Sequence, residues 1–223
     1  MNIHKAIIKG ENILKSKYIL SAKLDSEILM AKAIGEDRKY IILNNKINLE
    51  KKYLKYFQNL IKKRSFKKPI AHLINNKNFW KYDFFVSSDT LIPRPDTELL
   101  VEKILKLTKY KNKMNILDIG VGSGCILLTL LKERENFYGT GIDISKNCLN
   151  ISKINAKSLK VDNRVKFYKS DVDKFDKGKY DLIVSNPPYI KRLNLKYLEK
   201  DVINFEPKLA LDGGLDGLSE IRK

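Results

Sequence analysis

The sequence predicts a small bundle of helices followed by an α/β domain with a doubly wound parallel sheet. Two observations predict this fold class. Apolar residues recur at helical spacing through residues 1–75, whereas strand-like and helix-like patterns alternate from residue 115 to residue 185. Strands that alternate with helices require right-handed crossovers, which produce a parallel sheet. We therefore expect a helical domain at residues 1–75, a β-hairpin linker at residues 76–90 and the α/β domain at residues 91–223.

Three amphipathic segments form the predicted helical bundle. The second segment is expected to begin at a capping residue, Asp25 or Ser26, and to end at Gly35. The third segment covers residues 49–63 and gathers its apolar side chains on one face. Those side chains belong to Tyr53, Leu54, Phe57, Leu60 and Ile61. Such faces predict a buried core, and a groove for a partner would be a second use of the same surface.

The helical pattern gives way to turn and strand chemistry before the second domain. Residues 75–78 (Asn-Asn-Lys-Asn) favour a turn and the aromatic residues 79–86 favour strands, so a hairpin is expected. Residues 91–98 then contain two prolines, which break any helix. Asp96 or Thr97 is expected to cap the helix that follows.

The α/β domain is predicted from alternating strand and helix patterns. The predicted strands are residues 115–119, 138–142, 165–168 and 180–185, and the helices between them are residues 125–132 and 146–156. Because the carboxyl ends of parallel strands meet at one edge of a sheet, the residues that follow these strands are expected to lie together.

The chain carries a net charge of +18, which invites a nucleic-acid interpretation because basic side chains neutralise phosphates. Only 7 of its 44 basic residues are Arg, however, and the lysines are scattered rather than gathered in one block. This pattern favours a solvated basic surface that arose by compositional drift. An RNA-rich partner such as the ribosome stays open as a second interpretation.

The two cysteines, Cys125 and Cys148, are too few for a disulfide scaffold and lack metal-ligand spacing. Cys125 is expected to pack rather than to act as a nucleophile. No apolar stretch approaches the roughly 20 residues that cross a bilayer, and the first residues do not lead into an apolar signal core. These features favour a cytoplasmic protein with no metal and no membrane contact, and we expect a monomer.

A glycine-rich turn follows the first predicted strand of the α/β domain and opens a helix. It consists of Gly120, Val121, Gly122, Ser123 and Gly124. Glycines here let the backbone approach a ligand, and N–H groups at the start of the helix face that ligand. A nicotinamide dinucleotide is one candidate, but the third glycine comes one residue earlier than that motif requires.

Three acidic residues lie at or just beyond the ends of successive strands. Asp143 lies about 20 residues beyond the turn, where a carboxylate can bind the two hydroxyls of a ribose. Asp118 suits the positively charged group of an amino acid, and Asp171 suits an exocyclic amine such as that of adenine. Each alone would pass for ordinary loop polarity. Together they predict a pocket for a nucleoside that carries an amino acid, which describes S-adenosylmethionine.

Residues 186–189 (Asn-Pro-Pro-Tyr) follow the last predicted strand, and we name them the NPPY loop. An amide or aromatic amine nitrogen is a poor nucleophile because its lone pair is delocalised, so acceptors must hold its N–H groups. The Asn186 side-chain oxygen and the Pro187 carbonyl oxygen are two such acceptors. Pro188 stiffens the loop together with Pro187, and Tyr189 offers a flat face for a planar target. The loop therefore predicts methylation of a planar nitrogen through alignment rather than through a strong base.

With these motifs the chain resembles the protein-(glutamine-N5) methyltransferases that modify peptide chain release factors. Residues 91–98 resemble the PRPxTE segment of that family, residues 117–124 its LDxGxGSG cofactor loop, and residues 185–190 its SNPPYI loop. Residues 206–211 resemble its EPxxAL segment and residues 213–218 its GGxDGL segment. The NPPY loop alone also occurs in DNA adenine methyltransferases, whereas the other segments are more specific. The resemblance covers nearly the whole chain.

The resemblance implies a Rossmann-like methyltransferase domain that uses S-adenosylmethionine, preceded by a helical domain that helps hold the substrate protein. It implies that the cofactor is bound by Gly120, Val121, Gly122, Ser123, Gly124, Asp143, Asp171, Val172 and Asn186. It implies that the target glutamine is bound by Asn186, Pro187, Pro188 and Tyr189, of which Asn186, Pro187 and Tyr189 are catalytic. In the family that glutamine lies in the Gly-Gly-Gln (GGQ) motif of a release factor, and its side-chain nitrogen N5 receives the methyl group.

The sequence departs from the family pattern in two ways. Val172 stands where some relatives carry an aromatic residue, and only about four core strands can be placed where such a sheet normally has about seven. We therefore expect the domain to lack its last strands, which would lie beyond the strand that precedes the NPPY loop. Two alternatives to glutamine methylation are adenine-N6 methylation of DNA or RNA and a shortened relative that has lost turnover.

Overall fold

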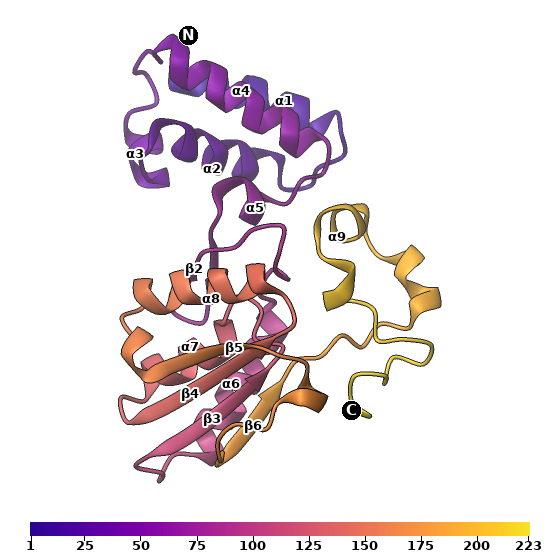
Figure 1. Cartoon of the computed structure of the whole chain (residues 1–223). Coiled ribbons are helices and arrows are strands. Elements are labelled where there is room, and N and C mark those ends of the chain that lie inside the picture. The colour runs from indigo at the N-terminus through magenta and orange to yellow at the C-terminus, as the bar shows by residue number, and fades with distance from the viewer. The chain divides into compact units, whose positions relative to one another are not determined.

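The computed structural model describes residues 1–223 and divides them into two compact units, Met1–Ile74 and Asn75–Lys223. Figure 1 shows the helices of the first unit and the sheet with its covering helices in the second. No helix has the length and apolar character needed to span a membrane.

Five helices form the first unit. They are α1 (Ile3–Lys15), α2 (Ala22–Ile34), α3 (Arg38–Leu43), α4 (Lys51–Ser65) and α5 (Ile70–Ile74). The apolar faces of α1, α2 and α4 meet in one core, in which Leu14, Leu29 and Phe57 are almost fully buried. Gly10 permits this close packing, because a Cβ there would lie 2.6 Å from Ser26 Oγ and 2.8 Å from the Phe57 ring.

The start of α2 differs from the sequence prediction. The helix begins at Ala22, and its N-cap residue Ser21 forms no side-chain cap. Asp25 and Ser26 instead lie within the helix and are buried. Asp25 accepts a hydrogen bond from Arg64 Nε at 2.7 Å, and Ser26 Oγ donates to the Ile7 carbonyl at 2.8 Å. Tertiary partners on α1 and α4 therefore use the polar groups that the local pattern suggested for capping.

The predicted end of α2 is confirmed. Gly35 caps the helix in the left-handed conformation with φ of 81°, a conformation that glycine adopts without a steric penalty. The third predicted segment forms α4, two residues later than expected at both ends. Its residues Phe57, Leu60 and Ile61 are buried as predicted.

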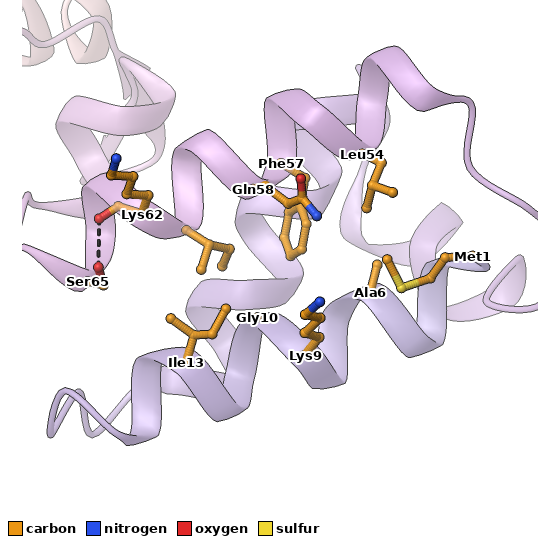
Figure 2. Close-up of a pocket in the computed structure, with 11 residues that line it drawn as sticks. Met1, Ala6, Lys9, Gly10, Ile13, Leu54, Phe57, Gln58, Lys62 and Ser65 are labelled. Carbon is orange, nitrogen blue, oxygen red and sulfur yellow. Dashed lines mark hydrogen bonds between the residues drawn. The ribbon is translucent and has the colours of Figure 1, made fainter.

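A groove of about 340 Å³ runs between α1 and α4. Figure 2 shows Ala6, Gly10 and Ile13 on α1 facing Leu54 and Phe57 on α4. Lys9 and Lys62 also line the groove, and no acidic side chain does. The groove is therefore apolar in its walls and basic in its charge.

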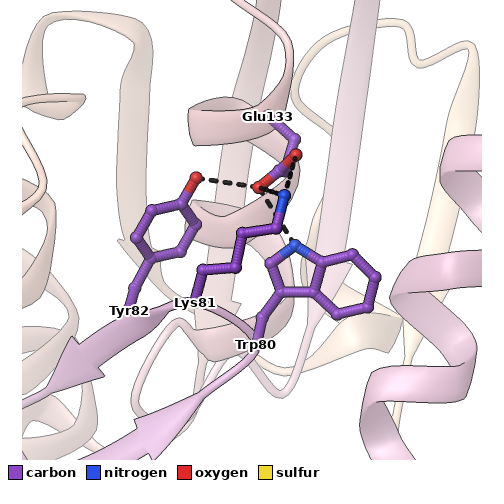
Figure 3. Close-up of polar contacts among 4 residues, drawn as sticks. All are labelled: Trp80, Lys81, Tyr82 and Glu133. Carbon is purple, nitrogen blue, oxygen red and sulfur yellow. Dashed lines mark hydrogen bonds and ion pairs between the residues drawn. The ribbon is translucent and has the colours of Figure 1, made fainter.

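A short hairpin opens the second unit. Its strands β1 (Lys77–Phe79) and β2 (Tyr82–Phe84) pair antiparallel. The turn falls at Trp80 and Lys81, not within residues 75–78. Figure 3 shows how Glu133, the last residue of α7 (Cys125–Glu133), anchors this turn. One Glu133 oxygen accepts from Trp80 Nε1 at 3.0 Å and from Tyr82 Oη at 2.8 Å.

Helix α6 (Pro95–Leu107) begins at the second of the two prolines and has no side-chain cap. The predicted cap by Asp96 or Thr97 is therefore wrong. Pro95 occupies the first turn of the helix, where the N–H that it lacks would have had no intrahelical partner. Thr97 is consequently free for another role in the site.

The predicted doubly wound α/β fold is confirmed by a four-stranded parallel sheet with the strand order β5-β4-β3-β6. Its strands are β3 (Met114–Ile119), β4 (Phe137–Asp143), β5 (Val165–Lys169) and β6 (Leu182–Ser185). Helix α7 follows β3, and α8 (Lys146–Ser158) follows β4. The chain moves outward from β3 to β5 and then returns to the other side of β3. The switch point, where such sheets bind ligands, lies between β3 and β6.

The remaining residues are mostly short helical turns. They are Asp162–Arg164, Val172–Lys174, Arg192–Tyr197 and Lys208–Ala210, together with α9 (Lys200–Phe205). After β6 the chain forms one further β-bridge, in which Ile190 pairs parallel with Asp212. This bridge brings the residues that follow the NPPY loop beside residues 211–214.

Candidate active site

The sheet register places three of the predicted site segments side by side. Ile119 at the end of β3 is the partner of Ile142 in β4 and of Ser185 in β6. The glycine turn, Asp143 and Asn186 follow these three positions directly, so they meet at one edge of the sheet. Ser185 Oγ donates to the Ile119 carbonyl at 2.8 Å and fixes the start of the NPPY loop beside the turn.

The backbone conformation of the glycine turn explains why it contains three glycines. Gly120, Gly122 and Gly124 have φ of 73°, 54° and 81°, in a region that other residues rarely occupy. A Cβ built on Gly120 would meet nothing within 4 Å, so open space lies next to the turn. The side chains of Val121 and Ser123, in contrast, are 4% and 3% exposed. We infer that the turn presents backbone rather than side chains to a ligand.

Two polar residues of α8, which the sequence did not single out, hold this turn in place. Ser152 Oγ donates to the Gly122 carbonyl at 2.8 Å, and Asn155 Nδ2 donates to the Ser123 carbonyl at 2.9 Å. Asn155 Oδ1 also accepts from the Phe85 amide at 2.7 Å. Both residues are buried. The signal available in the sequence is weak, namely polar residues on the inner face of an amphipathic helix.

Asp118 lies buried beneath the turn. Its side chain is 1% exposed, and neither carboxylate oxygen has a hydrogen-bond partner at bonding geometry. Burial raises the pKa of Asp118 to about 8, Asp143 adds to this rise, and the nearby Leu127 amide opposes it only in part. A buried carboxyl group without a partner costs free energy, so it marks a functional position more often than a structural one.

The other two acidic residues are more accessible. Asp143 accepts from the Gly122 amide at 3.0 Å and from the Ser145 amide at 2.8 Å, one bond at each oxygen. Asp171 precedes the turn Val172–Lys174, and its carboxylate lies 3.6 Å from Lys223 Nζ. The Ser170 amide donates to the Asp143 carbonyl at 3.2 Å, which keeps these two acidic residues on neighbouring chain segments.

The NPPY loop contacts the motif around the two prolines. Asn186 Nδ2 donates to Thr97 Oγ1 at 3.4 Å, which leaves the Asn186 oxygen free to accept. Asn186 is exposed, and Tyr189 is 67% exposed. A cavity of about 340 Å³ is lined by Asn186, Pro187 and Tyr189 together with Thr97 of α6 and Val202 of α9. Thr97 is thus a site residue that the sequence suggested only as a helix cap.

An ion pair between two distant segments lies beside the cavity, which Arg94 lines. Arg94 Nη2 donates to Glu206 Oε1, and Glu206 Oε2 accepts from the Ile92 amide at 3.3 Å. The Glu206 side chain is 2% exposed. Burial raises the pKa of Glu206, while Arg94 and the Ile92 amide oppose that rise. These contacts therefore join the PRPxTE-like segment to the EPxxAL-like segment, although the two are far apart in the sequence.

Cys125, the first residue of α7, lies in surroundings that disfavour its thiolate form. Burial raises the pKa of its thiol to about 12, and the neighbouring Asp118 adds to the effect. A thiol with such a pKa is almost wholly protonated at neutral pH and therefore unreactive.

The fold and this site define a class of protein, the Rossmann-like methyltransferases. The family model "Methyltransferase small domain" matches residues 94–209, and the model "PrmC N-terminal domain" matches residues 5–74. Among solved structures, the hMettl16 catalytic domain in complex with a 3′UTR hairpin shares the fold with a TM-score of 0.52. It is 17% identical, over 62% of this chain and 53% of that chain.

Curated relatives narrow the class. The release factor glutamine methyltransferase of Buchnera aphidicola subsp. Acyrthosiphon pisum is 43% identical over 221 residues, which are 99% of this chain and 78% of the relative. The protein of the same name from Clostridium acetobutylicum is 36% identical, over 100% of this chain and 79% of its own length. The chain belongs to the release factor glutamine methyltransferase family, which confirms the resemblance and the prediction of a methyltransferase enzyme.

Proposed function

We propose that this protein transfers a methyl group from S-adenosylmethionine to the side-chain nitrogen N5 of the glutamine in the GGQ motif of a peptide chain release factor. The relatives named above carry the corresponding name. The observation that carries the proposal for this chain is the Asn186–Thr97 hydrogen bond. It leaves an amide oxygen, rather than an amide nitrogen, available to a substrate N–H group.

The residues around the glycine turn fit the proposed cofactor. S-adenosylmethionine supplies a methyl group on a positively charged sulfur, next to an amino acid and a nucleoside. The positive φ of Gly120 and the open space beside it make room for such a ligand against the backbone. Asp118 is a buried carboxyl group without a partner, suited to the ammonium group, and Asp143 is suited to the ribose hydroxyls. Asp171 and Val172 complete the proposed nucleoside site, and the expectation of a metal-free site stays a prediction.

The residues of the NPPY loop suit a planar amide. In this proposal the Asn186 oxygen and the Pro187 carbonyl accept the two N–H groups of the glutamine amide, which orients the nitrogen toward the methyl group. Tyr189 is exposed and supplies a face for the flat amide. Pro187 and Pro188 restrict the backbone torsions of the loop. Catalysis then rests on alignment and charge complementarity rather than on a strong base.

The test is methyl transfer from labelled S-adenosylmethionine to a purified release factor. We expect the factor to gain the mass of one methyl group on the GGQ glutamine, and a factor with that glutamine replaced by alanine to gain none. DNA and RNA serve as competing acceptors in the same assay. Methyl transfer to adenine would replace this proposal with the nucleic-acid alternative. Cofactor binding without transfer to any acceptor would favour a relative that has lost turnover.

We further propose that the groove between α1 and α4 holds the release factor through an acidic, helical segment of that factor. The groove has apolar walls and is lined by Lys9 and Lys62 without an acidic residue. Helix α4 carries six basic side chains and no acidic one. An amphipathic helix with acidic flanks complements such a groove in shape and charge.

This docking proposal is tested by reversing the charge of the groove. We expect the double variant Lys9→Glu/Lys62→Glu to raise the KM for the whole release factor about 10-fold through charge repulsion. Its kcat, and its activity on a short peptide with the GGQ motif, should not change. The double variant Lys39→Glu/Lys46→Glu is the matched control, because it makes the same change in charge at two exposed lysines outside the groove. An unchanged KM, or equal effects of both variants, would reject this surface. A cytoplasmic, monomeric enzyme fits the proposal, with proximity to the ribosome as a further expectation.

A further inference from the structure

Residues 211–217 lie against the backbone of the NPPY loop and of the residues that follow it. The Ile190 amide donates to the Leu211 carbonyl at 3.1 Å, and the Gly213 amide donates back to the Ile190 carbonyl at 2.9 Å. The Arg192 amide donates to the Gly214 carbonyl at 2.8 Å. Three backbone hydrogen bonds therefore join a short segment to the exit of the loop.

Two glycines let these segments approach each other. A Cβ on Gly213 would lie 2.8 Å from the Pro188 carbonyl oxygen and 2.8 Å from Tyr189 Cα. A Cβ on Gly217 would lie 2.5 Å from the Tyr189 carbonyl oxygen. These are contacts with backbone atoms, so no side-chain rotation can relieve them. Any other residue at either position must displace the loop or its own segment.

The two glycines differ in backbone conformation. This difference separates two reasons for glycine, namely lack of space for a Cβ and a positive φ. Gly217 has φ of 86°, a conformation that disfavours most residues even in open space. Gly213 is not among the glycines with positive φ. The requirement for glycine at Gly213 is therefore entirely one of space, whereas at Gly217 space and backbone conformation both contribute.

An ion pair fixes the same segment. Asp212 accepts from Arg192 Nε at 2.9 Å and, through its other oxygen, from the Gly214 amide at 2.9 Å. Ala210 and Leu211, directly before Asp212, line the cavity together with Asn186 and Tyr189. Residues at the start of the segment thus line the cavity, and the segment also contacts the loop whose residues line the same cavity.

We infer that Gly213 and Gly217 are positioning residues, which set the conformation of the NPPY loop and thereby align its acceptors with the substrate nitrogen. This inference rests on the proposed function of the loop. The glycines touch no substrate. They act by allowing residues 211–217 to brace the backbone from Pro188 to Arg192.

The test combines hydrogen exchange with kinetics. In the wild-type protein the amides of Ile190, Arg192 and Gly213 should exchange slowly, because each is bonded across the brace. Gly213→Ala should speed their exchange at least 10-fold and lower kcat for the release factor at least 10-fold. Its affinity for S-adenosylmethionine, measured by calorimetry, should stay within twofold. Unchanged exchange and kcat in a folded Gly213→Ala variant would overturn the inference.

Asparagine substitutions separate backbone conformation from collision. Asn tolerates positive φ better than other residues, yet its Cβ at position 217 would still meet the Tyr189 carbonyl. Gly217→Asn should therefore lose protection and kcat, whereas the control Gly35→Asn, with φ of 81° and nothing within 4 Å, should retain both. If Gly217→Asn and Gly35→Asn have the same effect on protection and kcat, the proposed collision with the Tyr189 carbonyl would be rejected.

The milder variant Arg192→Ala removes only the ion pair to Asp212, and it should partly speed exchange if Gly217→Asn does not fold. No change in exchange in Arg192→Ala would count against the brace. If the wild-type protein methylates no release factor, the proposed function fails, while the exchange measurements still decide whether the brace exists.

Discussion

Arg94 and Glu206 form an ion pair across 112 residues of sequence, and this pair joins two segments that line the proposed substrate cavity. The Glu206 side chain is 2% exposed, whereas that of Arg94 is 41% exposed. Glu206 is held in the interior by Arg94 and by the Ile92 amide. The pair therefore orients residues 91–97, which include the Thr97 that contacts Asn186.

Glu206→Ala should lower both stability and activity. The change leaves the Arg94 guanidinium and the Ile92 amide without their partner, which should reduce the free energy of unfolding by about 1–3 kcal/mol. Because Thr97 loses its fixed position, the KM for the release factor should also rise. Urea unfolding and initial rates measure the two effects. Glu102→Ala on the exposed face of α6 is the control, and equal losses in both variants would contradict the role of Glu206.

Asn186→Ala should abolish methyl transfer and leave cofactor affinity largely intact. The change removes an acceptor that is used only at the target nitrogen, so kcat should fall at least 100-fold, or about 3 kcal/mol in transition-state stabilisation. Calorimetry with S-adenosylmethionine measures the affinity. Lost affinity in this variant would show that Asn186 binds the cofactor rather than the acceptor.

Asp143→Ala should weaken the binding of S-adenosylmethionine. The carboxylate accepts from the Gly122 and Ser145 amides, so its loss removes the proposed ribose ligand and also loosens the glycine turn. We expect at least a 10-fold rise in Kd. Asp173→Ala in the turn Val172–Lys174 is a control at a neighbouring acidic residue. An unchanged Kd for Asp143→Ala would reject the ribose assignment.

Asp118 should make the stability of the protein depend on pH. Its pKa of about 8 in the folded state lies above the ordinary value of 3.8 for this carboxyl group, so the folded state keeps a proton that the unfolded state has lost. Stability should therefore fall as pH rises from about 4 to about 8, by at most about 1.4 kcal/mol per pH unit. Asp143 and the Cys125 thiol are the titratable groups that interact with Asp118.

The check is to compare Asp118→Asn with the wild-type protein. Asn keeps the shape of the side chain but cannot ionise, so its free energy of unfolding should change less between pH 5 and pH 8. Urea unfolding at both pH values measures the difference. Identical slopes in the two proteins would mean that Asp118 is already ionised in the folded state.

Local features of the chain were predictable because they depend on local chemistry. The glycine turn, the alternation of strands and helices and the end of α2 at Gly35 follow from backbone preferences and apolar periodicity. The predicted helix caps were wrong because they, too, were inferred from local chemistry alone. Asp25, Ser26 and Thr97 have the side chains that cap helices, but partners from distant segments bind two of them and Asn186 contacts the third.

The sequence by itself determined the α/β class, the order of the elements and the family, since these are encoded in periodicity and in contiguous motifs. The tertiary structure decided which distant residues meet. It buried Asp118 without a partner, paired Arg94 with Glu206 and placed Gly213 against the Pro188 carbonyl. Such contacts depend on how closely the packed segments approach one another in space. A pattern in the linear sequence does not specify the separation between distant segments.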